Sequence, residues 1–207
     1  MKIIDEVRDN VRFPKGEDGV KTLKRMNEVH NKSAIWAINR VNICENLDIE
    51  ILDIGFGGGQ NLLNLRDKFK NSKLYGIDYS PTSLDVAKET TKNLKNIYLK
   101  IGDVSKKIEF DENKFDIITA FETLYFWENL NVAFSEIKRV LKPDGVFLLH
   151  LEGTTKKTLD EWSNGVNLKN KLNENEIYEL LKQNGFKKVE IYALDSSEIR
   201  TFIAKKQ

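Results

Sequence analysis

One stretch of the chain constrains its fold more than any other. Residues 51–54 form an apolar, β-branched run typical of a buried strand, and glycines follow at positions 55, 57, 58 and 59. A leucine-rich helical pattern begins directly after them. A strand, a glycine turn and a helix in this order are typical of the nucleotide-binding half of a doubly wound α/β domain. The glycines let the backbone take conformations closed to other residues and let a ligand approach it closely.

The spacing of these glycines narrows the class of ligand. A dinucleotide site needs G-x-G-x-x-G, but counted from Gly55 the third glycine is replaced by Gln60. The chain has no Gly-Lys-Ser/Thr of a phosphate-binding P-loop. From Asp53 to Gly59 it has D-x-G-x-G-x-G, which resembles the first motif of class I S-adenosylmethionine-dependent methyltransferases. The alternative is a glycine-rich turn that binds no ligand.

Acidic residues follow the next two predicted strands. Residues 73–78 are predicted as a strand that ends at Asp78, and a third strand runs into residues 102–104. A carboxylate only accepts hydrogen bonds, so Asp78 suits the two hydroxyls of a ribose. The resemblance implies that Asp103 meets the adenine amino group. The alternatives are a charge that stabilises a helix N-terminus at Asp78 and an ordinary turn residue at Asp103.

Three consecutive aromatic residues follow the fourth predicted strand. Residues 115–121 are an unbroken apolar run apart from one acid, which is typical of a strand covered on both faces. The strand exits into Glu122–Trp127, and ligands of open α/β sheets bind beyond the carboxyl ends of strands. Aromatic rings there would suit an amphipathic or cationic acceptor. Alternatively the loop folds back onto the next helix, so we expect some rings in the core and others in a pocket.

Two more residues are candidates for the acceptor site. His30 lies on a helical stripe that runs from about Val20 to Val41, before the first strand. It is either a core histidine that bonds a backbone carbonyl or a base that faces the substrate. Trp162 stands in the polar connection 152–172, which is predicted to be irregular, and long irregular connections are often functional.

Composition limits the partners and the compartment. The 207 residues include 33 Lys and Arg against 32 Asp and Glu, so a net charge of +1 gives no strong attraction to nucleic acid or to a membrane. The single Cys44 excludes an internal disulfide and suits a reducing cytosol. The charged first ten residues argue against a signal peptide, and no apolar run is long enough to span a membrane. We therefore predict a cytoplasmic protein.

The resemblance to the methyltransferases covers nearly the whole chain. It includes a Met-Asn-x-x-His segment at 26–30 and the Glu-Thr-Leu-Tyr-Phe-Trp segment at 122–127. It implies a Rossmann-like, doubly wound α/β sheet of seven strands, mostly parallel with the last strand antiparallel, and an N-terminal helix that covers the cofactor cleft. The last two strands, about 187–194 and 198–204, should pair as a hairpin. We divide the single globular domain into an arm and cap helix at 1–45 and a methyltransferase domain at 46–207.

The resemblance and the motifs together give a set of expected site residues. The predicted cofactor is S-adenosylmethionine, and the product is S-adenosylhomocysteine. The expected cofactor-binding residues are Asp53, Gly55, Phe56, Gly57, Gly59, Asp78, Tyr79, Gly102, Asp103, Val104 and Phe121. The expected catalytic residues are His30, Glu122 and Tyr125, and the expected acceptor-binding residues are Tyr125, Trp127 and Trp162. No metal is expected, since no His, Cys and Asp residues have metal-ligand spacing.

The expected activity is methyl transfer by in-line displacement to an unidentified acceptor, most simply a small molecule. A domain that binds the cofactor as a sensor or scaffold without turnover is the alternative. A nicotinamide oxidoreductase is disfavoured by the missing third glycine. The acceptor atom and the oligomeric state are left open.

Overall fold

The computed structural model describes residues 10–206, which alternate strands and helices. The strands are β1 (Glu50–Ile54), β2 (Lys73–Asp78), β3 (Ile97–Ile101), β4 (Phe115–Phe121), β5 (Leu141–Leu151), β6 (Lys188–Ala193) and β7 (Arg200–Lys205). The helices are α2 (Gly16–Val29), α3 (Asn31–Ile38), α4 (Gln60–Lys68), α5 (Pro81–Thr90), the 3₁₀ turn η1 (Leu124–Phe126), α6 (Leu130–Val140), α7 (Lys156–Ser163) and α8 (Glu174–Gln183). The first nine residues of the expected arm, and most of the region in which a signal peptide was judged absent, lie outside the described residues.

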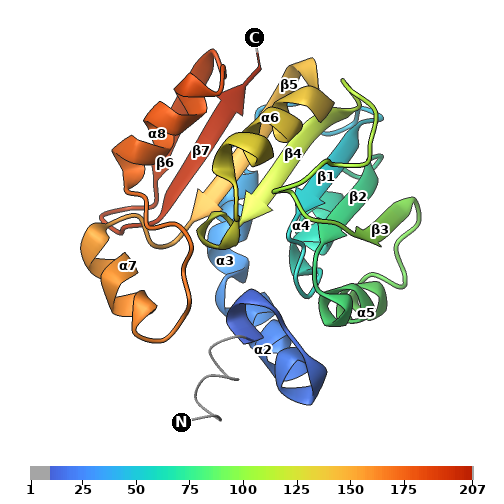
Figure 1. Cartoon of the computed structure of the whole chain (residues 1–207). Helices are drawn as coiled ribbons and strands as arrows, with labels where there is room; N and C mark the ends of the chain where they lie inside the picture. The colour runs from blue at the N-terminus through green and yellow to red at the C-terminus, as the bar shows by residue number, and fades with distance from the viewer. Residues whose placement is uncertain (1–9, 207) are drawn as a thin grey trace.

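The strands form one seven-stranded sheet in the order β3-β2-β1-β4-β5-β7-β6 (Figure 1). Strands β1 to β5 pair in parallel, and β7 runs antiparallel to both of its neighbours, β5 and β6. The expected fold class and the expected C-terminal hairpin are therefore confirmed. The strand order reverses between β1 and β4, which is where ligands bind in sheets of this kind.

Each face of the sheet has its own apolar core. On one face, Leu52, Ile118 and Phe147 pack with Phe134 and Ile137 of α6, and with α8 beyond them. The core of the other face contains the helix residues Ala37, Leu62 and Leu65 and the strand residues Ile51, Leu74, Ile117 and Leu148. Consecutive residues of β4 thus point into two different cores, which explains why its sequence is apolar at almost every position.

The N-terminal helical pattern divides into two helices. The stripe predicted from Val20 to Val41 breaks at His30, whose N–H bonds to Met26 O while its own carbonyl accepts from Ala34. Ser33 Oγ donates to the same His30 carbonyl at 2.9 Å, which competes with regular helix continuation. Helix α2 therefore lies across the carboxyl ends of the central strands, while α3 runs along the sheet (Figure 1).

The connection predicted as irregular contains a helix. Helix α7 begins after Thr155, whose hydroxyl accepts a hydrogen bond from Thr158 N, as an N-cap residue does. Thr155 is therefore the local sequence signal for this helix. Within residues 10–206, no helix is both long and apolar enough to cross a membrane.

Candidate functional site

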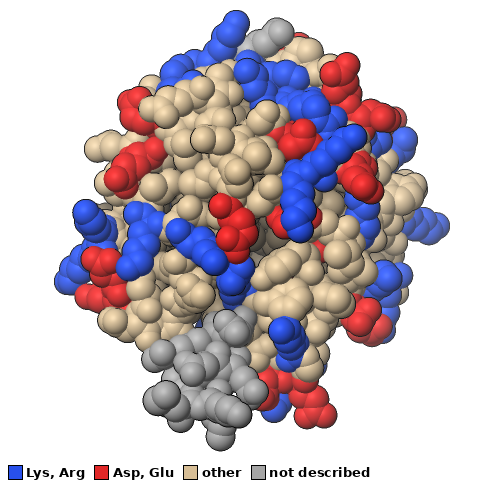
Figure 2. All heavy atoms as spheres, in the orientation of Figure 1, with Lys and Arg blue, Asp and Glu red and all other residues tan. Residues whose placement is uncertain are grey.

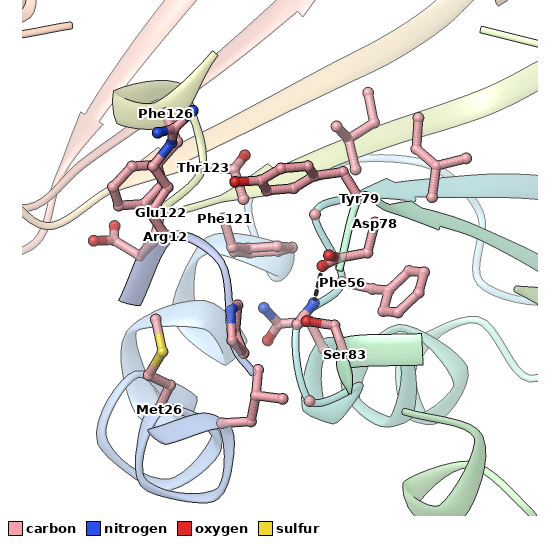
Figure 3. A pocket seen from close by; sticks show the side chains of 18 of the residues that line it. Arg12, Met26, Phe56, Asp78, Tyr79, Ser83, Phe121, Glu122, Thr123 and Phe126 are labelled. Atoms are coloured by element: carbon pink, nitrogen blue, oxygen red, sulfur yellow. Dashed lines mark hydrogen bonds between the residues drawn. The ribbon is translucent and has the colours of Figure 1, made fainter. Parts of the chain in front are cut away.

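A pocket opens at the carboxyl ends of the parallel strands, beside the point where the strand order reverses (Figure 3). The glycine loop after β1 forms one wall, the ends of β2 and β3 form the next, and the exit of β4 closes it on the other side. Helix α2 covers it through Leu23, Met26 and Asn27, and Asn27 Nδ2 donates to Gly58 O at 3.2 Å. Elements far apart in the sequence thus enclose one continuous cavity.

The glycine loop takes a backbone that side chains rarely tolerate. Gly55, Gly57 and Gly59 have φ angles of 73°, 51° and 85°. A Cβ on Gly55 would lie 2.3 Å from Thr123 Cγ2, so this glycine lets the exit of β4 approach the loop. Gly59 faces the other way, because its Cβ would meet the backbone of Ala87 in α5 at 3.0 Å. Gly55 and Gly57 line the pocket, whereas Gly59 allows close packing of two helices.

Asp78 points into the pocket from the end of β2 (Figure 3). Its two carboxylate oxygens accept hydrogen bonds from Gly57 N at 2.8 Å and from Ser80 N at 2.9 Å. Burial raises the pKa of this carboxyl above its ordinary value, and the two N–H donors oppose that shift. Each oxygen can accept a further hydrogen bond, so the side chain can hold the glycine loop and a ligand together.

Most of the expected cofactor residues surround the same cavity. Those that line it besides the glycine loop and Asp78 are Phe56, Tyr79, Gly102, Asp103, Val104 and Phe121. Figure 3 shows Tyr79 and Phe121 reaching into it from opposite sides. The structure thus brings together residues from four strand ends that the sequence placed at one sheet edge.

Asp53 lies beneath the loop and is not among the described pocket-lining residues. It is 1% exposed, its Oδ1 accepts from Thr119 Oγ1 at 2.7 Å, and its Oδ2 is buried without a hydrogen-bond partner among residues 10–206. Burial raises the pKa of the Asp53 carboxyl to about 7, with a further contribution from Asp78. Direct contact with a ligand in the pocket is therefore not part of its role in this structure.

A strap formed by residues 11–14 crosses the mouth of the pocket, and sequence reasoning identified it only as part of an arm. Ser80 Oγ donates to Pro14 O at 2.8 Å, and the Phe13 ring lies 4.6 Å from that of Tyr79. On the opposite side, the Arg12 guanidinium pairs with Glu128 at 2.6 Å. The strap is therefore anchored on both sides of the cavity.

Three titratable side chains meet beside the pocket, and two of them, His30 and Glu122, line it. We call His30, Glu122 and Glu152 the His30 cluster; they come from the α2–α3 junction and from the ends of β4 and β5. His30 Nδ1 lies 2.9 Å from Glu152 Oε2, and Glu122 Oε1 accepts from Glu152 N at 2.6 Å. Ser33 Oγ donates to Glu152 Oε1 at 2.5 Å. Glu122 also has a φ of 59°, which is uncommon for a residue with a side chain.

The pKa values of the three side chains in the cluster are shifted in different directions. Burial first, and the neighbouring Glu152 second, raise the pKa of Glu122 to about 8. The Glu152 carboxylate raises the pKa of His30. Burial alone would raise the pKa of Glu152, but the contacts from His30 and Ser33 outweigh it and leave that pKa lowered. Glu122 therefore holds its proton at neutral pH, and the neighbouring Glu152 carboxylate favours the charged form of His30.

The expected aromatic residues divide as the sequence suggested. Phe126 and Trp127 line the pocket, although Trp127 also packs edge-on against Phe134 in the core. The Tyr125 hydroxyl instead donates to Gly153 O and accepts from Gly153 N, both at 3.0 Å. Trp162 packs edge-on against Tyr125 and likewise is not among the described lining residues. Neither Tyr125 nor Trp162 is therefore part of the acceptor end of the pocket.

One imidazole nitrogen and one carboxylate oxygen from each glutamate of the His30 cluster lie within 4.8 Å of one another. They are close enough to share a cation or a proton. Both oxygens of Glu152 and one of Glu122 already accept contacts from protein groups. We therefore assign the cluster to proton binding, and the absence of a metal requirement stays a prediction. Spacing could not reveal this cluster, because its members are far apart in the chain.

Comparisons with known proteins agree with this geometry. A family model described as a methyltransferase domain matches residues 52–149. The demethylmenaquinone methyltransferase of Leptospira interrogans is 30% identical over 134 residues, which cover 62% of this chain and 54% of that protein. The sterol 4-C-methyltransferase of Caenorhabditis elegans is 28% identical over 152 residues, or 72% of this chain and 43% of that protein. The chain thus matches about half, or less, of the length of these curated relatives.

Solved structures show the same fold at lower identity. A phosphoethanolamine N-methyltransferase of Haemonchus contortus superposes with a TM-score of 0.78 at 18% identity, over 97% of this chain and 60% of that one. YcgJ of Bacillus subtilis has a TM-score of 0.69 at 19% identity, over 86% of this chain and 100% of that one. The glycine motif, the strand order and the family match over residues 52–149 agree, and this part of the chain is similar to the methyltransferase domain of the class I S-adenosylmethionine-dependent enzymes.

Proposed function

We propose that this protein transfers a methyl group from S-adenosylmethionine to a small organic acceptor. The observation that carries the proposal is that one cavity joins two chemically different ends. Its nucleoside end is formed by residues 55–58, Asp78 and Asp103. Its acceptor end is formed by Met26, His30, Glu122 and Phe126, described next.

The nucleoside end suits the cofactor by its donors and acceptors. Asp78 offers carboxylate oxygens for ribose hydroxyls, and Asp103 offers an acceptor for the adenine amine. Val104 and Phe121 supply apolar wall on which a base can lie. Thr123 Oγ1 is buried in the wall without a hydrogen-bond partner among residues 10–206, so it is available to a bound ligand.

The acceptor end combines apolar walls with titratable groups. Met26, Phe126 and Trp127 are apolar, while His30 and Glu122 are the polar groups beside them. Such a mixture suits an amphipathic small molecule, which buries its apolar part and directs one polar group toward the cluster. The curated relatives are named for demethylmenaquinone and sterol, both largely apolar acceptors, and this supports the proposal.

The residues of the chain have three tasks in such a reaction. When bound, the cofactor supplies an already activated methyl group. The walls align the acceptor with that group, and α2 and the strap exclude water from the cavity. Glu122 or His30 takes the proton if the acceptor loses one, since both lie at the acceptor end. Residues 46–206 then form the catalytic domain, and the described part of the N-terminal region, residues 10–45, caps it.

Charge and compartment complete the proposal. Figure 2 shows basic and acidic side chains interspersed on one face, without an extended area of a single sign. This favours a small-molecule acceptor over nucleic acid. A cytoplasmic location stays a prediction from the cysteine usage.

Two measurements test the proposal. Isothermal titration calorimetry with S-adenosylmethionine, S-adenosylhomocysteine and a nicotinamide dinucleotide should show binding of the first two only. Purified protein is then incubated with a metabolite extract and cofactor labelled on the methyl group, and label should appear in an extract compound. Binding without any transfer across extracts would favour the alternative, a sensor or scaffold, and absence of binding would contradict both functions.

A further inference from the structure

We propose that the His30 cluster distinguishes the charged methyl donor from its neutral product by releasing a proton to solvent when the sulfonium binds. The inference rests on the proposed cofactor and concerns its reactive end, where the donor carries a positive charge and the product does not. Methyl transfer changes the cofactor only there. A group that responds to that charge can favour entry of the donor and departure of the product.

The cluster lies where such a charge would act. Glu122 follows Phe121 directly at the end of β4, and both line the cavity that contains the glycine loop. The next residue, Thr123, lies so close to Gly55 that a Cβ there would be 2.3 Å from its methyl group. The Glu122 backbone is therefore adjacent to the loop that holds the cofactor, and the acceptor end has no wall separating it from the nucleoside end.

The cluster also holds a proton that can leave. Two carboxylates and one imidazole meet within 4.8 Å. The pair of His30 and Glu152 shares one proton, and a second proton on the cluster relieves the repulsion between the two carboxylates. That proton resides on Glu122, whose pKa is raised to about 8 by burial and by Glu152. A cation entering the cavity replaces the proton as the partner of the Glu122 carboxylate. The neutral product offers no such replacement.

The other groups that face the cluster do not interfere near neutral pH. Arg25 on α2 opposes the charge of His30 and lowers its pKa slightly. Burial lowers the pKa of His150 on β5 to about 4 and raises that of Tyr125 in η1 well above its ordinary value. Burial also raises the pKa of Asp78, which lines the pocket. It raises the pKa of Asp53, which lies beneath the glycine loop, to about 7, so the contribution of Asp53 must be measured separately.

Linkage gives the expected size and sign of the effect. If donor binding releases a proton, donor affinity rises with pH as long as the free protein still holds that proton. The affinity ratio of donor to product should therefore rise between pH 6 and 8, by at most about tenfold per pH unit, and level off above pH 8. Both ligands carry the same amino, carboxyl and nucleoside groups, but the sulfonium charge lowers the pKa of the donor's amino group. Each ligand is therefore titrated alone, and the effect of its own protonation is subtracted from the ratio.

Calorimetry on the full chain measures this ratio at pH 6, 7, 8 and 9 without needing the acceptor. Glu122→Gln keeps a carbonyl oxygen for Glu152 N, so it should bind both ligands with a ratio that no longer depends on pH. Glu89→Gln is the matched control, since it removes one exposed carboxylate of α5, which pairs with Lys92 just beyond that helix, and its ratio should follow the wild type. Asp53→Asn should also keep the wild-type dependence, and added chelator should change nothing.

Histidine NMR gives a second readout, because the chain has only two histidines. Of the two, His30 should titrate at the higher pH, because the Glu152 carboxylate raises its pKa while burial lowers the pKa of His150 to about 4. The donor should shift the His30 titration to lower pH than the product does, and Glu152→Gln should lower it in the free protein.

The outcomes separate the two proposals. A pH-independent ratio in the wild type, or a dependence that disappears with Asp53→Asn, with chelator or with Glu89→Gln, overturns the inference while leaving the proposed cofactor intact. Failure of both ligands to bind overturns the proposed function and the inference with it. A rising ratio that Glu122→Gln flattens supports both.

Discussion

The two ends of the pocket differ in how far apart along the chain their contacting residues lie. At the nucleoside end, Asp78 bonds to Gly57 and Ser80, which are 21 and 2 residues away. At the acceptor end, Ser33 and Glu152 are 119 residues apart. The contacts that hold Asp78 thus lie within one strand–helix–strand unit and its next residues, whereas the second end brings together the α2–α3 junction and the end of β5. Short-range motifs can therefore reveal a cofactor and still leave the acceptor unidentified.

The largest expected effect concerns the buried acid beneath the nucleoside end. Because burial raises the pKa of Asp53 to about 7, against about 4 in an unfolded chain, the folded protein binds an extra proton between these values. The free energy of unfolding therefore falls as pH rises from about 4 to 7, and this side chain contributes up to about 4 kcal/mol of that fall. Asp53→Asn should be more stable than the wild type at pH 8.

Urea unfolding of both proteins at pH 4 and pH 8 measures this difference. Near pH 4 the two should differ little, because Asp53 is then protonated in the folded state and about half protonated in the unfolded chain. An equal gap at the two pH values would show that Asp53 does not titrate differently in the folded protein. Asparagine keeps an acceptor for Thr119.

The next prediction breaks the contact that joins the two ends. Gly55→Ala places a Cβ at a φ of 73° and within 2.3 Å of Thr123 Cγ2. The left-handed backbone costs about 1–2 kcal/mol and the steric overlap about 1–3 kcal/mol, so we expect a loss of about 2–5 kcal/mol in unfolding experiments. Donor binding should weaken as well.

Two variants identify the cause of that loss. Adding Thr123→Ser to Gly55→Ala removes the clashing methyl group and should recover part of the stability. Gly57→Ala has Leu23 as its nearest neighbour at 3.6 Å, so only the backbone cost of about 1–2 kcal/mol remains. If all three variants lose the same stability, the clash with Thr123 is not the reason.

A smaller effect should separate binding of the nucleoside from recognition of the methyl group. Asp78→Ala removes the acceptor for Gly57 N and Ser80 N as well as the proposed ribose partner. Affinity for donor and product should fall equally, by about 1–3 kcal/mol, because both carry the same ribose. Calorimetry with the two ligands checks this, and unchanged affinity for either would remove Asp78 from the site.

The sequence predicted the nucleoside end much better than the acceptor end. The strand–glycine–helix pattern and the acid of β2 are local signals, and the structure places Gly55, Gly57 and Asp78 around one cavity. Glu152 was not predicted, because nothing near it in the chain shows that β5 ends beside the α2–α3 junction. The strap was equally hidden, since its anchors Ser80 and Glu128 lie at least 66 residues away.

Aromatic residues illustrate the same limit from the other side. The run from Tyr125 to Trp127 is compatible with a pocket wall and with a core. Nothing in the sequence shows which of the three rings faces the pocket and which faces the core. The decision comes from Gly153, which lies across from Tyr125 only once β5 is in place. Sequence reasoning could therefore predict a division of the rings without assigning Tyr125 to the core.

The smallest predicted effect tests that division. Tyr125→Phe keeps the ring but removes the hydroxyl that bonds both Gly153 O and Gly153 N. Two backbone groups in a buried setting then lose their partner, so the free energy of unfolding should fall by about 1–2 kcal/mol. Cofactor affinity should stay within a few-fold, since the hydroxyl does not reach the described pocket lining. Once an acceptor is identified, turnover by Tyr125→Phe at a temperature well below its unfolding transition should match the wild type, whereas His30→Ala should lose turnover. Full stability with lost turnover in Tyr125→Phe would return Tyr125 to the acceptor site and show that the contact with Gly153 opens during catalysis.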